Sequence, residues 1–269
     1  MNAMVRGLGV PAAVLLAGTA MAAGPPSGPL KKCPPDAVVS GTVCMDKYEA
    51  SVWRIPDPLG TNAKLVKKVQ KGKATQADLT AGGATQLGTM SDDYAPCTDN
   101  GQTSCSDIFA VSLPGVTPAR FITWFQAQQA CKNSRKRLPS NAEWQAAVAG
   151  TPDPGSDNGT TDCNTAPISP VAATGSRSNC VSSDGAFDMV GNLWEWVADW
   201  VPLSTACPGW GSFSNDSMCL SGASTTDTSP GALLRGGSFF QGSSAGPLSV
   251  NGNAQPSDWF DVVGFRCAR

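Results

Sequence analysis

The sequence predicts a disulfide-rich domain that mixes strands with a small number of helices. Ten cysteines lie among 269 residues, and this even number suits an exported chain in an oxidising compartment. A loosely alternating apolar pattern begins at Val43 and favours a strand. Two segments in the middle of the chain carry helical patterns. We therefore expect helices and strands within one disulfide-linked unit.

The N-terminal residues predict a signal peptide over residues 1–23. Arg6 precedes an apolar stretch at 8–17 and a small-residue exit, A-M-A, at 20–22, the order that signal peptidase recognises. The stretch is too short for a membrane helix, so we expect a secreted or periplasmic protein without a transmembrane anchor. Loss of Arg6 leaves 18 basic against 21 acidic residues, a net charge of −3. This balance gives no reason to expect nucleic acid as a partner.

Residues 24–39 begin with a Pro- and Gly-rich stretch and are expected to form a linker, so that residues 40–269 make a single domain. The run at 43–55 predicts one strand. Residues 57–107 are polar and have no sustained period, which predicts a long loop or insertion clipped by Cys97 and Cys105. The five lysines in this segment are interpreted as solvated loop residues.

Two helices are predicted next. In the segment 119–134, spacing places Phe121, Trp124, Phe125 and Cys131 on one apolar face, and the helix should end near residue 132. Ser140 has a glutamate three residues later, a capping box that predicts a second helix ending at residue 150.

Cysteine spacing suggests four close pairs and leaves two cysteines over. The close pairs are Cys33 with Cys44, Cys97 with Cys105, Cys163 with Cys180, and Cys207 with Cys219. A zinc site is the competing interpretation, but the chain has no C-x-x-C and no histidine. The absence of histidine also excludes Ser-His and Cys-His nucleophile pairs.

Motifs in the last third of the chain resemble one family. They are GAFDMVGNLWEWVADW at 185–200, LLRGGSF at 233–239 and GFRCAR at 264–269. Together with RKRLPSNAEW at 135–144, they resemble the formylglycine-generating enzyme, or sulfatase-modifying factor, family. The resemblance covers residues 40–269 and implies an α+β, C-type-lectin-like fold with low regular secondary structure. It also implies that the two remaining cysteines, Cys131 and Cys267, form a disulfide.

The same resemblance implies a structural calcium ion held by Asn192 and Glu195. Calcium takes six to eight oxygen ligands, so backbone carbonyls or water would have to complete the shell. The alternative is that the motif is purely structural, with its tryptophans filling a core. A second family calcium site matches only at Asn164, and the Cys163–Cys180 loop is expected to replace it.

The active enzymes of this family use copper held by two thiolates, at places that correspond to Gln241 and Gly246 here. An amide and a glycine cannot replace thiolates for Cu(I), so no copper is expected. A formylglycine-generating oxidoreductase acting on sulfatase cysteines remains the alternative function, and a fixed structural pseudoenzyme is a third.

The segment from Ala232 to the C-terminus resembles the variable region of proteins diversified by diversity-generating retroelements. The shared frame is R-G-G-S-x-x-x-G-x-x-A-G, then P-S, then G-F-R. The resemblance predicts non-catalytic binding of a protein or glycan through the surface of residues 239–261, in a receptor diversified by a retroelement. The candidate ligand-binding residues are Phe239, Phe240, Gln241, Ser244, Ser249, Asn251, Asn253, Asp258, Trp259, Phe260 and Asp261. Aromatic and small polar residues are the composition of adaptable paratopes; the alternative is that the aromatics are buried in a fixed family member.

Overall fold

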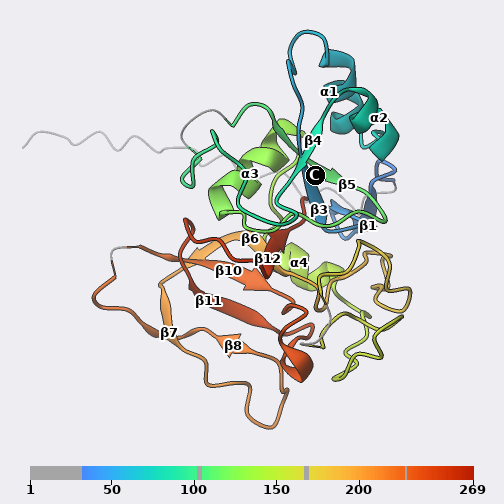
Figure 1. Ribbon diagram of the computed structural model, residues 1–269. Coiled ribbons are helices and arrows are strands. Elements are labelled where there is room, and N and C mark those ends of the chain that lie inside the picture. The colour runs from blue at the N-terminus through green and yellow to red at the C-terminus, as the bar shows by residue number, and fades with distance from the viewer. Residues whose placement is uncertain (1–31, 102–104, 167–169, 228) are drawn as a thin grey trace, which may run out of the picture.

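The computed structural model describes residues 32–101, 105–166, 170–227 and 229–269 (Figure 1). The predicted signal peptide lies outside the described residues. β1 (Ala37–Ser40) lies mostly within the range predicted as linker, so ordered structure begins before residue 40. The remaining elements are β2 (Val43–Asp46), β3 (Ala50–Arg54), α1 (Ala63–Gln70), α2 (Gln76–Ala81), β4 (Thr85–Leu87), β5 (Ile108–Ser112), α3 (Trp124–Asn133), α4 (Asn141–Ala147), β6 (Trp194–Val201), β7 (Ser204–Ala206), β8 (Met218–Cys219), β9 (Ser221–Ala223), β10 (Gly231–Arg235), the 3-10 helix η1 (Gly242–Ser244), β11 (Val250–Ala254) and β12 (Val263–Phe265).

The largest sheet has five strands in the order β12-β6-β10-β11-β8. Its three central strands, β6, β10 and β11, are antiparallel, while β12 and β8 add to the two sides in parallel. A second, antiparallel sheet has the order β4-β3-β5, and β1–β2 and β7–β9 form two-stranded ribbons. The five-stranded sheet is built from the last third of the chain, so it carries the predicted binding segment.

Helix α3 lies between the two larger sheets (Figure 1). The main core joins Val52 of β3, Ala127 and Cys131 of α3, and Trp196 and Phe265 of the five-stranded sheet. These side chains are all fully buried. Burial of one large apolar side chain stabilises a fold by on the order of 2 kcal/mol. Because both sheets contribute such side chains, this shared core fixes them relative to one another.

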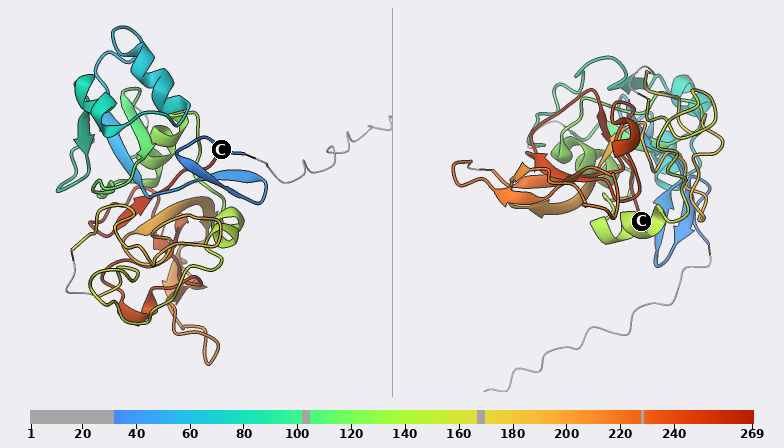
Figure 2. Two further views of the ribbon diagram at one scale, coloured as in Figure 1. Left: turned by 90° about the vertical axis from the view of Figure 1, so that its right-hand side faces the viewer. Right: turned by 90° about the horizontal axis from the view of Figure 1, so that it is seen from below.

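The other faces of the sheets are covered by different helices. Trp53 and Phe109 point from the three-stranded sheet into a core formed with α1 and α2, as strand alternation requires when their neighbours face α3. Trp144 of α4 packs with Val197 and Leu233 on the second face of the five-stranded sheet. Figure 2 shows the resulting arrangement, with α1 and α2 at one end and the five-stranded sheet at the other.

The prediction of a loop over residues 57–107 was wrong, because this segment contains α1, α2 and β4. In α1, Leu65, Val66 and Val69 are buried while the lysines between them face solvent, so the helix is amphipathic. The apolar stripe is only three residues long and is interrupted by lysines, so the helical period is hard to recognise in the sequence. Helix α2 begins at a capping box made by Thr75 and Asp78. The predicted pairing within this segment is confirmed, because Cys97 and Cys105 form a disulfide.

The single strand predicted over residues 43–55 is two strands, β2 and β3, which pair in different sheets. The break falls at residues 47–49, where Glu49 is fully buried. The second predicted helix is α4; Ser140 caps it with Glu143 as predicted, but it ends at Ala147 rather than at residue 150.

The predicted face of the first helix also needs correction. Phe121 precedes α3 at a positive φ of 54°, and the buried residues of the helix are Gln126, Ala127, Ala130 and Cys131. Trp124 and Phe125 are half-buried and form edge contacts with the exposed Trp200 of β6. Small residues face the core because α3 is confined between two sheets, a constraint that spacing alone does not reveal.

Five disulfides join all ten cysteines, in the pairs that spacing suggested and the family resemblance completed. The Cys131–Cys267 bond spans 136 residues and connects α3 to the segment after β12. Near it, Cys44 and Arg269 exchange backbone hydrogen bonds of 2.9 and 3.0 Å. Across the described ranges, none of the helices has the length and apolar character needed to cross a bilayer.

Candidate binding surface

The predicted ligand-binding residues lie on β11 and on the connections that flank it. The turn after β10 begins with Gly236 and Gly237, whose φ values of +90° and +80° are in the left-handed region that favours glycine. A Cβ at Gly237 would collide with Ala245, so the missing side chain lets the segment containing η1 fold back against β10. Residues 239–244 therefore form one group, and residues 251–261, on β11 and the loop before β12, form the other.

Three of the aromatics in these groups are exposed: Phe240 to 64%, Trp259 to 44% and Phe260 to 42%. Trp259 and Phe260 follow β11 in a loop rather than lying on a strand, which allows both rings to reach solvent. Asn253 and Asp261 are also exposed. In the structure, the adjacent Trp259 and Phe260 therefore do not fill the core, as the alternative would require.

The other candidate residues are less available. The prediction that Ser249 binds a ligand was wrong. Ser249 is fully buried and its hydroxyl donates a hydrogen bond of 2.6 Å to the carbonyl of Ser244, which stabilises the turn. Phe239, Gln241, Ser244, Asn251 and Asp258 are half-buried. Two of these stabilise turns, since Gln241 accepts from the hydroxyl of Ser238 at 2.9 Å and Asp258 accepts from the amide of Gln255 at 2.7 Å.

A cavity of about 220 Å³ brings part of the second group together. Its lining consists of Trp194, Leu234, Asn251, Asn253, Ala254, Phe260, Val262 and Val263. The sheet supplies the apolar floor of the cavity. Three of the lining residues were predicted to bind a ligand: Asn251, Asn253 and Phe260. The volume is below the roughly 300–1,000 Å³ of small-molecule sites, so the cavity suits a single projecting group.

Sequence reasoning missed two residues beside this cavity. The amide of Phe121 donates to the carbonyl of Phe260 at 3.0 Å, and its ring meets Trp259 edge-on at a centroid distance of 6.0 Å. The guanidinium of Arg120 lies 5.1 Å from the centre of the Phe121 ring and donates to the carbonyl of Asp261. A phenylalanine at positive φ is rare, and no local signal in the sequence predicts one.

The family resemblance assigns the places of the copper ligands to Gln241 and Gly246. The carboxylate of Asp216 lies against Gly246 so closely that a Cβ there would collide with it. Asp216 is buried, and its Oδ2 accepts from the amide of Leu248 at 2.7 Å. Every cysteine of the chain is in a disulfide. The residues present therefore do not fit a thiolate-bound copper ion.

The proposed calcium ligands do not fit a calcium ion either, because hydrogen-bond donors already surround them. Both oxygens of Glu195 accept from Arg266, at 2.6–2.9 Å, and Oε2 also accepts from the indole of Trp144 at 2.7 Å. The Oδ1 of Asn192 accepts from Asn164 at 3.0 Å and from the amide of Ala172 at 2.8 Å. The positive charge beside Glu195 is thus supplied by a buried arginine.

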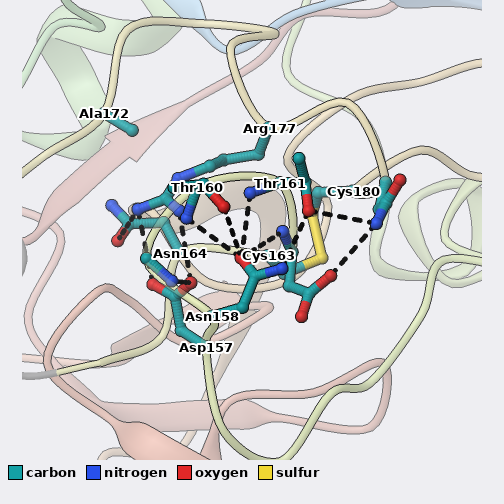
Figure 3. A network of polar contacts seen from close by, with 12 residues as sticks. Asp157, Asn158, Thr160, Thr161, Cys163, Asn164, Ala172, Arg177 and Cys180 are labelled. Atoms are coloured by element: carbon teal, nitrogen blue, oxygen red, sulfur yellow. Dashed lines mark hydrogen bonds and ion pairs between the residues drawn. A yellow bond between two sulfur atoms is a disulfide. The ribbon is translucent and has the colours of Figure 1, made fainter.

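An arginine also lies beside Asn164, the one residue matching the second calcium site (Figure 3). Arg177 donates to Asn164 at 3.2 Å and pairs with Asp157 through two contacts of 3.2 and 3.4 Å. Nearby, the Oδ1 of Asn158 accepts from the amides of Thr160 and Thr161. The Cys163–Cys180 disulfide closes this loop, so side-chain contacts and a covalent bond hold it together.

These features define an α+β domain with a mixed sheet, few helices and five disulfides. The sequence profile of the FGE-sulfatase family, described as a sulfatase-modifying factor enzyme 1-like domain, matches residues 61–269. The chain therefore belongs to this family, as the motifs predicted.

Comparison with solved structures finds matches at low sequence identity. The "Major Tropism Determinant P3c Variant" is 20% identical with a TM-score of 0.47, covering 88% of this chain and 54% of that one. This chain thus matches about half of that protein. PvdO from Pseudomonas aeruginosa is 19% identical with a TM-score of 0.40, covering 90% and 89%. "Treponema denticola variable protein 1" is 22% identical with a TM-score of 0.30, covering 56% and 70%. No curated protein matches the chain.

Proposed function

We propose that this protein is an exported, non-catalytic binding protein that recognises a protein or a glycan through the surface of residues 239–261. The proposal rests on the exposure of three aromatic rings, Phe240, Trp259 and Phe260, and on an apolar cavity with a carboxamide rim that Phe260 lines. Exposed aromatic rings beside small polar groups supply contact area at low entropic cost. Such rings are the side chains most often found at energetic centres of interfaces.

Two observations support a binding role over the family's oxidase chemistry. Cu(I) requires soft ligands, whereas Gln241 and Gly246 occupy the corresponding places and Asp216 fills the space beside Gly246. The alternative, formylglycine generation, is tested by incubating the protein with copper, oxygen and a peptide containing Cys-x-Pro-x-Arg. Mass spectrometry should find the cysteine unchanged; conversion to the aldehyde would refute the non-catalytic role.

Export is supported by the leader-like residues 1–23 and by the complete pairing of ten cysteines, since disulfides persist in oxidising compartments. The narrower proposal is a receptor diversified by a retroelement. Sequencing the DNA that flanks the gene tests it. A reverse-transcriptase frame and a near-copy of the codons for residues 232–269, differing only at adenines, are expected. Their absence would favour a fixed member of the family.

Binding itself is tested with the mature protein on a glycan array and on an array of cell-surface proteins. The informative variant is Trp259→Ala/Phe260→Ala. Leu59→Ser is the matched control, because Leu59 is 93% exposed and precedes α1, outside the proposed binding surface of residues 239–261. We expect at least one signal that the double variant loses and the control keeps. If every signal is equal in both variants, the proposed surface is wrong.

A further inference from the structure

The connection between β7 and β8 forms a projecting loop outside the segment in which binding was predicted. Its base is closed by the Cys207–Cys219 disulfide, and it extends beyond the sheet at the bottom of Figure 1 and in the left view of Figure 2. Phe213 is 76% exposed, more than any aromatic residue of the predicted surface. Its ring makes an edge contact with Trp210 at 6.5 Å.

The base of this loop is continuous with the proposed binding surface. Cys219 pairs with Asn251, which lines the 220 Å³ cavity. On the other side, the amide of Ser217 donates to the carbonyl of Ser244 at 2.8 Å. Asp216 accepts from the amide of Leu248. The disulfide and these contacts fix the base of the loop to both groups of predicted ligand-binding residues, while its tip stays free.

The chemistry of the loop selects among possible partners. Between Cys207 and Cys219, Asp216 is the single charged residue, and it is buried. A loop without lysine or arginine has no cations with which to attract a polyanionic glycan or an anionic membrane. The remaining residues are glycine, serine, asparagine, Trp210 and Phe213, with a proline and a methionine near the ends, a composition close to that of antigen-binding loops.

The shape of the loop adds a second criterion. A projecting ring requires a concave, apolar surface on the partner, as long antibody loops do when they enter recesses of folded antigens. Burial of one ring gains too little free energy to hold a protein on a lipid bilayer, where even a whole acyl chain binds only marginally. The same ring can decide affinity when neighbouring contacts already exclude water. A folded protein therefore fits the loop best.

We propose that the Cys207–Cys219 loop is a second binding element of this protein, and that it inserts Phe213 into an apolar recess of a folded partner protein held at the adjacent surface. The proposal rests on the proposed binding function and narrows its ligand class from protein or glycan to protein. It also divides the interface into residues 239–261 and a disulfide-closed loop outside that segment.

Site-specific photocrosslinking tests this proposal in the full chain. The probe is p-benzoylphenylalanine placed at position 213, at position 260, or at position 59 as an exposed control, in cultures of the organism that carries the gene. We expect positions 213 and 260 to capture the same protein and position 59 not to capture it. Phe213→Ser should reduce capture from position 260 about tenfold or more, with the Cys207–Cys219 bond intact by mass and the thermal midpoint unchanged.

The outcomes separate the two levels of inference. Capture from position 260 alone, or undiminished capture after Phe213→Ser, would overturn the role of the loop and leave the proposed function standing. Capture of lipid, glycan or a second copy of this chain at position 213 would overturn the assignment of a protein partner. No capture from position 260 above the level of position 59 would count against the proposed function itself, and against the loop with it.

Discussion

Replacing Arg266 by methionine should strongly destabilise the protein. The guanidinium is fully buried and donates to Glu195 at 2.6–2.9 Å, to the carbonyl of Asp46 at 3.1 Å and to the carbonyl of Phe187 at 2.8 Å. Removal of one partner of a buried ion pair costs about 3–5 kcal/mol. In a domain of this size that corresponds to a fall in the thermal midpoint of roughly 6–20 °C. Calorimetry at pH 7 measures it.

The loss should also depend on pH. Burial raises the pKa of Glu49 well above its usual range and that of Asp188 to about 6, and in both cases Arg266 opposes the shift. Without the guanidinium both pKa values rise further. A carboxyl group with a raised folded-state pKa stabilises the fold at low pH and loses that contribution as pH rises through the folded-state pKa. The deficit of Arg266→Met relative to the natural protein should therefore be larger at pH 8 than at pH 5.

A second variant isolates the ion pair from simple packing. Arg266→Met/Glu195→Gln removes the uncompensated charge but keeps an acceptor for the indole of Trp144, so it should be more stable than Arg266→Met alone. A loss below about 1 kcal/mol in the single variant, or no recovery in the double variant, would refute this reasoning. A calcium chelator should leave the midpoint of the natural protein unchanged; a fall would show that calcium, rather than Arg266, neutralises Glu195.

Three further results are expected. Asp188→Asn should raise the free energy of unfolding at pH 8 by about 3 kcal/mol, because it removes a buried carboxylate whose pKa is raised from 3.8 to about 6, and most of this gain should disappear by pH 4; equal gains at both pH values in thermal melts would contradict the titration. Trp259→Ala/Phe260→Ala should change the midpoint by only a few degrees, because both rings are more than 40% exposed; a large fall in a thermal melt would show that they are core residues. Cys131→Ser/Cys267→Ser should cost up to about 5 kcal/mol in urea unfolding, since the 136-residue separation makes this the longest loop closed by a disulfide; no loss would mean that native strain cancels the chain-entropy gain.

Parts of the site could be predicted from sequence because their signals are local. The exposure of Phe240, Trp259 and Phe260 follows from aromatics set among small residues. Ser249 has the same composition signal and was misassigned, because its burial depends on the turn that brings the carbonyl of Ser244 to its hydroxyl. Single-residue composition does not distinguish a serine that faces solvent from one that closes a turn.

The sequence by itself determined the family, the five disulfide pairs and the capped start of α4, because each depends on a short motif or on cysteine spacing. Only the tertiary structure decided that Arg120 and Phe121 meet the loop at 259–261, and that Asp216 occupies the space at Gly246. It also decided that Arg266 fills the environment of Glu195. These contacts join residues from 30 to more than 130 positions apart. Their pairing is set by how the sheets and helices pack, and no periodicity along the chain encodes it.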